Sequence, residues 1–172
     1  MLSLFAAILR ISEVEGGGLA RTFTRIELSA PLQDLCDSYA PAVSDGGRTL
    51  SCDIEPGIRI HGEWELIAQA VINLLDNAQH HTPPGTHITV EAEMIGEQVR
   101  LSVADNGPGV APGDQSRIVR RFTRLDSSRS TPGHGLGLNL VAAIASVHGG
   151  DLAIDDNAPG LRVTMTLPRA AG

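Results

Sequence analysis

Apolar residues recur at helical spacing in four segments of the chain, residues 1–15, 31–43, 63–81 and 136–148. A repeat of three or four residues places these side chains on one face of a helix. Glycine or proline follows closely after each segment, as is usual where a helix ends. We therefore predict four helices. The pattern is strongest in residues 63–81, where the apolar positions are Leu66, Ile67, Ala70, Val71, Leu74, Leu75 and Ala78.

Shorter runs with alternating or β-branched apolar residues predict strands between and after these helices. A Gly96-Glu97 pair between two of the runs indicates a hairpin. Strand pairs interleaved with helices lack the regular alternation of a parallel doubly wound sheet. We therefore predict an α+β fold, a two-layer α/β sandwich in which helices cover one face of a mixed, mostly antiparallel sheet. The predicted strands are 24–28, 49–54, 58–61, 86–95, 98–104, 152–154 and 162–167.

Composition narrows the class of protein. The 172 residues are enough for one domain, and 42% of them are apolar. A net charge of -7 argues against a broad basic footprint for nucleic acid. The apolar run at residues 2–9 is too short to span a membrane, and the sequence shows no secretory signal. Two cysteines are too few for a disulfide framework. We expect a cytoplasmic domain without membrane contact.

Two amides and a strand-end carboxylate are the first candidates for binding chemistry. Asn73 and Asn77 are four residues apart and share one helix face, where amide oxygens can ligate Mg²⁺. Asp105 follows a strand and begins the sequence Asp-Asn-Gly-Pro-Gly109, so its carboxylate can accept from an amino group. Taken alone, the asparagines also fit a solvated helix edge, and the second sequence also fits an ordinary turn.

A glycine-rich segment at residues 133–138 opens the last predicted helix. Backbone N–H groups at a helix N-terminus form a site for phosphate. The spacing Gly-x-Gly-x-Gly differs from the dinucleotide fingerprint, which also requires a preceding strand. A long stretch, residues 105–134, precedes it, and we expect a lid there with a short helix near 116–122. For residues 133–138, the alternative to a phosphate site is a flexible loop that leads into a helix.

The order and spacing of these segments resemble the ATP-binding catalytic domain of sensor histidine kinases, with its Bergerat-type fold. Residues 73–83 resemble the N box, 105–109 the G1 box, 121–124 the F box and 133–138 the G2 box. The resemblance covers residues 25–168. It implies an ATP-binding domain over 19–168, a tail at 169–172, and a remnant of a dimerisation hairpin over 1–18. The larger superfamily includes DNA gyrase, heat-shock chaperones and mismatch-repair ATPases.

The resemblance also implies roles for the residues of the first two boxes. Asn77 would ligate a Mg²⁺ ion that bridges the ATP phosphates, and Asn73 would assist. Asp105 would accept a hydrogen bond from the adenine amino group. Gly107 and Gly109 would let the base of the lid fold over the nucleotide.

Further roles fall on the lid and the phosphate loop. The N–H groups of Leu136 and Leu138 would hold phosphates. Arg129 would reach the γ-phosphate, or stay in solvent. His80 stands where relatives often have lysine or arginine, so its phosphate contact would be weaker; His81 would stack near adenine. The remaining positions implied to lie at the nucleotide are Phe122, Arg124, Gly133, Gly135 and Gly137.

The resemblance implies phosphoryl transfer rather than hydrolysis. The ATPase branches place a glutamate where Asn73 stands, and an amide is not a general base. No acceptor histidine box occurs in the sequence, so we expect phosphorylation of a histidine on a separate dimerisation domain, with a response regulator as an indirect partner. The parent protein would be anchored in the inner membrane. Alternatives are a non-catalytic ATP-gated binding module, an ATPase or an anti-sigma-type serine kinase.

Overall fold

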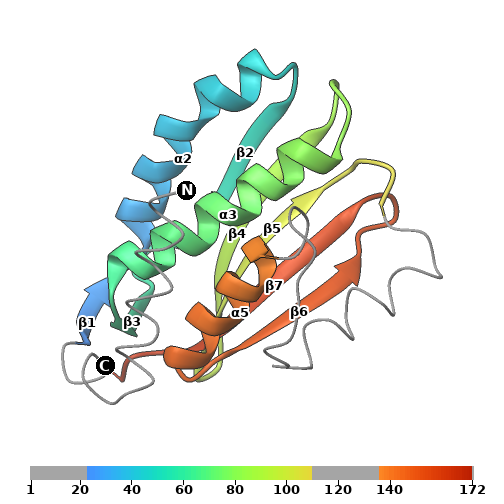
Figure 1. Ribbon diagram of the computed structural model, residues 1–172. Helices are drawn as coiled ribbons and strands as arrows, with labels where there is room; N and C mark the ends of the chain where they lie inside the picture. The colour runs from blue at the N-terminus through green and yellow to red at the C-terminus, as the bar shows by residue number, and fades with distance from the viewer. Residues whose placement is uncertain (1–22, 110–135, 172) are drawn as a thin grey trace.

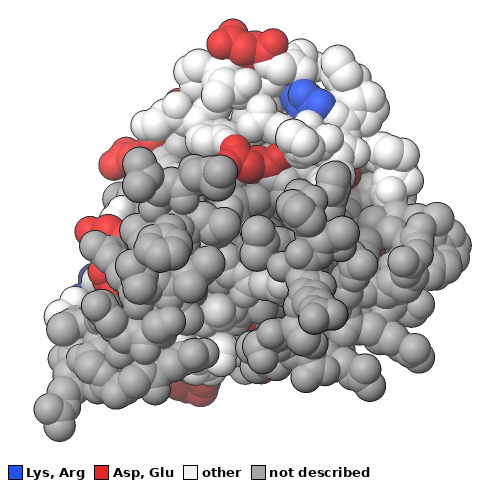
Figure 2. Space-filling model, in the orientation of Figure 1, with Lys and Arg blue, Asp and Glu red and all other residues white. Residues whose placement is uncertain are grey.

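The structure is a computed structural model that describes residues 23–109 and 136–171. The helices predicted at residues 1–15 and 116–122, and most of the predicted lid, lie outside the described residues. No helix in the described ranges is long and apolar enough to cross a bilayer. Among the described residues on the face shown in Figure 2, acidic side chains lie at several separate places and basic ones are sparse.

A mixed five-stranded sheet forms one layer of the domain. The strand order is β2-β4-β5-β7-β6, in which β2 and β4 are parallel and every other neighbouring pair is antiparallel. The predicted sheet type and the Gly96-Glu97 hairpin are therefore confirmed. The strands are β2 (Thr49–Ile54), β4 (His87–Ile95), β5 (Gln98–Asp105), β6 (Asp151–Asp156) and β7 (Leu161–Pro168).

Three helices form the second layer and lie across one face of this sheet (Figure 1). They are α2 (Ser29–Asp45), α3 (Trp64–His81) and α5 (Leu136–Val147). A separate two-stranded sheet, β1 (Thr24–Glu27) with β3 (Arg59–Gly62), lies at one end of the helical layer (Figure 1). The α+β sandwich predicted from the sequence is thus the observed architecture.

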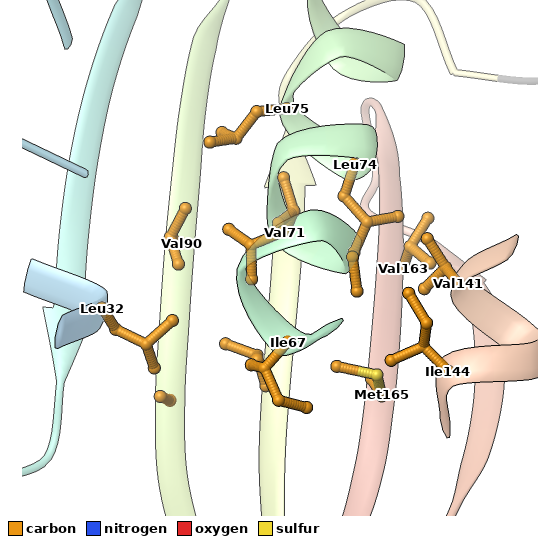
Figure 3. Packing of buried hydrophobic residues seen from close by; sticks show 14 of the residues in the cluster. Leu32, Ile67, Val71, Leu74, Leu75, Val90, Val141, Ile144, Val163 and Met165 are labelled. Atoms are coloured by element: carbon orange, nitrogen blue, oxygen red, sulfur yellow. The ribbon is translucent and has the colours of Figure 1, made fainter. Parts of the chain in front are cut away.

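The core lies between the two layers, and α3 is at its centre. Ile67 and Val71 point from α3 toward the strands, where Met165 of β7 lies beside Ile144 of α5 (Figure 3). Each of these four side chains is at most 1% exposed. Burying a side chain of this size contributes about 1.5–3 kcal/mol, so the apolar stripe of α3 fixes the helix on the sheet.

Helix α2 begins earlier than predicted, at Ser29 instead of Pro31. The carboxylate of Glu27 accepts hydrogen bonds from the N–H groups of Ser29 at 2.9 Å and Ala30 at 3.2 Å. These groups have no partner within the helix, and the missing N–H of Pro31 in the first turn costs nothing. The side chain of Glu27, two residues before Ser29, therefore sets the start of α2.

Two boundaries near the C-terminus also differ from the prediction. Strand β6 is longer at both ends than residues 152–154, because the whole of Asp151–Asp156 pairs with β7. Residues 169–172 are predicted as a tail, and the first two of them contact the domain. The N–H of Arg169 donates to Glu97 O and that of Ala170 to Arg59 O, both at 2.9 Å, and Ala170 is buried. The domain fold therefore continues to Ala170.

His148, directly after α5, connects three parts of the fold. Its Nδ1 donates to Ile144 O at 2.8 Å, and its Nε2 accepts from the N–H of Glu63 at 3.2 Å, just before α3. Phe23 stacks on the ring with centroids 4.5 Å apart. Burial lowers the pKa of His148, which favours the neutral ring that can accept at Nε2. His148 is thus a structural residue.

Candidate functional site

The candidate site lies where the C-terminal half of α3 meets the end of β5 and the beginning of α5. Helix α3 packs against both of these elements. Asn73 and Asn77 project from α3, Asp105 ends β5, and Gly137 lies in the first turn of α5. Three segments that are far apart in the sequence are therefore neighbours in the fold.

Asn73 faces the first turn of α5. Its Nδ2 donates to Gln69 O at 2.9 Å, within α3. A Cβ atom added to Gly137 would lie 3.9 Å from Asn73 Oδ1, so the amide oxygen is directed toward Gly137. Asn77 is one turn further along α3, and both asparagines are half-buried. The two amides are thus at the edge of the core, where a ligand can reach them.

Asp105 is buried at the end of β5, with 7% of its surface exposed. Its Oδ1 accepts a hydrogen bond from the N–H of Gly107 at 2.9 Å. This bond fixes the orientation of the carboxylate. A Cβ atom at Gly107 would lie 2.8 Å from Thr82 Cγ2, so glycine allows the turn to pack against the end of α3. The turn Asp105–Gly109 therefore packs the end of β5 against the C-terminal end of α3, the helix that carries the asparagines.

The turn between β6 and β7 supports Asp105 from behind. Asn157 Nδ2 donates to the main-chain oxygen of Asp105 at 2.8 Å. Gly160 has a φ of +113°, and a Cβ atom there would overlap the same oxygen. Gly109 also packs on this turn, since a Cβ atom there would lie 3.0 Å from Gly160 O. The main chain at Asp105 is thus fixed by a turn that is about 50 residues away in sequence.

An ion pair on the sheet face opposite α2, α3 and α5 holds this turn in place. Arg162 of β7 forms a salt bridge with Glu91 of β4, and its Nη1 donates to Ser102 Oγ at 3.1 Å. Hydrogen bonding to the guanidinium lowers the pKa of Glu91. Arg162 Nη2 also lies 3.5 Å from Asn157 Oδ1. The support of Asp105 thus extends across three strands.

Arg48 fixes the C-terminal end of α3. Its Nε donates to Thr82 Oγ1 at 3.0 Å, its Nη2 donates to Thr82 O, and its Nη1 donates to Gly46 O at 2.8 Å. Thr82 Oγ1 in turn donates to Ala78 O at 2.7 Å. A cation at a helix C-terminus interacts favourably with the helix dipole. Arg48 therefore holds the segment that contacts Gly107.

The remaining predicted site residues are exposed, packed against the core, or outside the described ranges. His80 and His81 are both exposed, with ring centroids 6.0 Å apart. Leu138 packs its side chain against the core, so its main chain is the part that can meet a ligand. Outside the described residues lie Phe122, Arg124, Arg129, Gly133 and Gly135, and of Leu136 only the main chain is described.

Sequence reasoning missed Asn157, Gly160, Arg48 and Thr82. The sequence Asn-Ala-Pro-Gly at 157–160 has the composition of a turn, and this signal was visible. Its contact with Asp105 depends on β7 lying next to β5, which turn composition does not indicate. Arg48 likewise looks like a loop residue until the fold places it at the end of α3.

Comparison with known proteins gives a consistent family. The sequence matches the family of histidine kinase-, DNA gyrase B- and HSP90-like ATPases over residues 62–171. The signal transduction histidine-protein kinase/phosphatase MprB of Mycolicibacterium smegmatis is 38% identical over 144 residues, which are 80% of this chain and 29% of that protein. The sensor-like histidine kinase SenX3 of the same species is 27% identical over 169 residues, which are 97% of this chain and 44% of that protein.

Solved structures agree with these matches. The mycobacterial sensor histidine kinase MprB has a TM-score of 0.68 and 30% identity, over 87% of this chain and all of that one. Full-length ShkA in complex with AMPPNP has a TM-score of 0.75 and 26% identity, over 99% of this chain and 36% of that one.

The chain belongs to the family of histidine kinase-, DNA gyrase B- and HSP90-like ATPases. Within this family it is an ATP-binding catalytic domain of the sensor histidine kinase type, as the resemblance implied. It spans about a third of the length of the MprB relative that it matches.

Proposed function

We propose that the chain binds Mg²⁺-ATP where α3, β5 and α5 meet, and transfers the γ-phosphoryl group to a histidine on a separate dimerisation domain. The observation that carries the proposal is the proximity of Asn73 Oδ1 to Gly137, on a helix whose C-terminal end packs against the turn that orients the buried Asp105. One ligand that reaches all three needs an amino group at one end and phosphates with a cation at the other. ATP has this combination.

Asp105 would recognise adenine. Its Oδ1 already accepts from Gly107, so the other carboxylate oxygen would accept from the exocyclic amino group. Guanine has a carbonyl at that position, and two acceptors would face each other. His81 is exposed at the end of α3 and would stack on the base, while His80 beside it would lie toward phosphate. Gly107 and Gly109 would allow the nucleotide to approach the main chain.

Asn77 would bind Mg²⁺, and Asn73 would assist. Amide oxygens suit this hard cation, which keeps several waters and coordinates phosphate oxygens. In the described part of the chain, no group of three or more His, Cys, Asp or Glu residues is placed to hold a metal. The two amides are therefore the ligand set that fits best, and the bound cation would neutralise phosphate charge.

The segment 133–138 would hold the phosphates. Main-chain N–H groups at the start of α5 point along the helix axis and have no partner within the helix. Arg129 would approach the γ-phosphate from the lid, together with Phe122 and Arg124 in the segment before it. Catalysis would then rest on positioning and charge neutralisation.

An amide at position 73 favours transfer over hydrolysis, since it cannot activate water as a general base. The acceptor histidine and the response regulator belong to the proposal, as do a hairpin segment over 1–18 and a nucleotide domain from 19 onward. The ATP-binding domain would lie in the cytoplasm, and its parent would be anchored in the inner membrane.

Calorimetric titration with ADP and AMPPNP, with and without Mg²⁺, tests the site. We expect saturable binding that Mg²⁺ tightens, and Asn77→Ala should remove this tightening. Asn77→Asp, which keeps an oxygen ligand, should retain it. Unchanged Mg²⁺ dependence in Asn77→Ala would reject the assignment. Incubation with a dimerisation domain then tests transfer: acid-labile phosphohistidine supports the kinase, whereas phosphate release without an acceptor indicates an ATPase.

Asn157→Ala should weaken adenine nucleotides by roughly fivefold, because a lost neutral hydrogen bond costs about 1 kcal/mol and frees the main chain at Asp105. Asn157→Asp also removes the donor and places an acceptor against the same oxygen, so it should weaken adenine nucleotides at least as much as Asn157→Ala. Binding of an inorganic triphosphate should not change in either variant. Equal loss of both ligands would show that Asn157 stabilises the fold without positioning Asp105.

A further inference from the structure

The two cysteines of the chain meet between α2 and β2, away from the nucleotide site. Cys36 is on the buried face of α2 and is 1% exposed. Cys52 is in β2, where it packs against the core in alternation with Leu50 and Ile54. Helix α2 packs against β2, so the core between these two elements holds Cys36 and has Cys52 packed against it. Both are free thiols.

We propose that Cys36 and Cys52 form a dithiol site that a low-molecular-weight disulfide converts into an intramolecular bond between α2 and β2. The Cys52 thiolate attacks one sulfur of the reagent, the reagent's S–S bond breaks, and one small thiol leaves. Cys36 then loses its proton and attacks the Cys52 sulfur, and the second small thiol leaves. The dithiol loses two electrons and two protons, and the reagent is reduced to two thiols.

The surroundings of the two sulfurs set this order of attack. Cys52 is partly exposed, whereas Cys36 is in the core, so the reagent reaches Cys52 first. The hydrogen bond from Cys36 lowers the pKa of Cys52, and that bond together with burial raises the pKa of Cys36. Once Cys52 is in a mixed disulfide its charge is gone, so one cause of the raised pKa of Cys36 disappears. The second step then becomes easier.

The bond would close a short loop in the chain. Residues 37–51 lie between the two cysteines, and a loop of about 15 residues gives a stabilisation that raises the melting temperature by about 5–10 °C in a domain of this size. It would also tie α2 to the edge of the sheet. Tyr39 of α2 donates a hydrogen bond to Asp76 of α3, so the tied helix is the one that contacts the asparagine-bearing helix.

Treatment of the chain with oxidised glutathione tests the proposal without any nucleotide. We expect the intact mass to fall by two hydrogens, both thiols to resist alkylation, and the melting temperature to rise, all reversed by dithiothreitol. Cys36→Ser should stop at a glutathione adduct on Cys52. Cys52→Ser should leave the buried Cys36 unmodified.

Several results would overturn the inference. They are a wild-type chain that stays as a mixed disulfide, one that forms bonds only between chains, and one that remains reduced. If Cys36→Ser does not fold, Cys36→Ala provides the same test. A lower melting temperature after oxidation would show that the thiols are not placed for the bond. None of these results depends on whether the chain binds ATP.

Discussion

Replacement of Asp105 by asparagine is expected to raise the Kd for ADP by roughly 10- to 100-fold. A hydrogen bond to a charged group contributes about 1.5–3 kcal/mol, and its loss corresponds to this change in affinity. Asparagine can still accept from the N–H of Gly107 through Oδ1, as Asp105 does at 2.9 Å. Its Nδ2, however, would face the adenine amino group with a donor. The turn is therefore preserved while the recognition is lost.

The measurement is titration of wild type and Asp105→Asn with ADP and GDP. The preference for ADP over GDP should shrink in the variant, because asparagine can donate to the guanine carbonyl. Thermal unfolding of both proteins is the control for folding, and the melting temperatures should agree closely. The same Kd for ADP in both proteins would remove Asp105 from the site.

Gly160→Ala is expected to lower the free energy of unfolding by more than about 4 kcal/mol, which is exceptional for a single substitution. Gly160 has a φ of +113°, and a Cβ atom there would overlap the main-chain oxygen of Asp105. The strain of the backbone and the overlap add, since neither is relieved by rotation of a side chain. The turn must move away from β5, so the variant should also bind nucleotide poorly.

Gly57→Ala is the matched control for this substitution. Gly57 has a φ of +79°, and a Cβ atom there would meet nothing within 4 Å. It should therefore show only the conformational cost of a left-handed residue, about 1–2 kcal/mol. Urea unfolding of both variants separates the cost of the left-handed backbone from the cost of the overlap with the main chain of Asp105. If Gly160→Ala costs no more than Gly57→Ala, the turn is not packed on Asp105 as described.

Elements with strong local patterns could be predicted from the sequence. The helix predicted at 63–81 is observed as Trp64–His81, because seven apolar positions repeat along a single face. The β4–β5 hairpin follows from a Gly-Glu pair between two alternating runs. Strand β6 was predicted too short, because Asp151, Asp155 and Asp156 are polar and only pairing with β7 makes them strand residues.

The sequence predicted which segments contribute to the candidate site. It did not predict how these segments contact one another. Spacing alone places Asn73 and Asn77 on one helix face, and the position after a strand marks Asp105. The approach of Gly137 to Asn73 depends on how α5 packs on α3, which apolar periodicity does not specify. The support of Asp105 by Asn157 depends on a contact between distant segments, so no local signal contains it.

His148 links the C-terminal end of α5 to two other parts of the fold. The helix has 12 residues and is therefore about 18 Å long. One end begins beside Asn73, and the other leads into His148, which touches Phe23 and the N–H before α3. A displacement of α5 at the end beside Asn73 would therefore be transmitted to Phe23, the first residue that the structure describes.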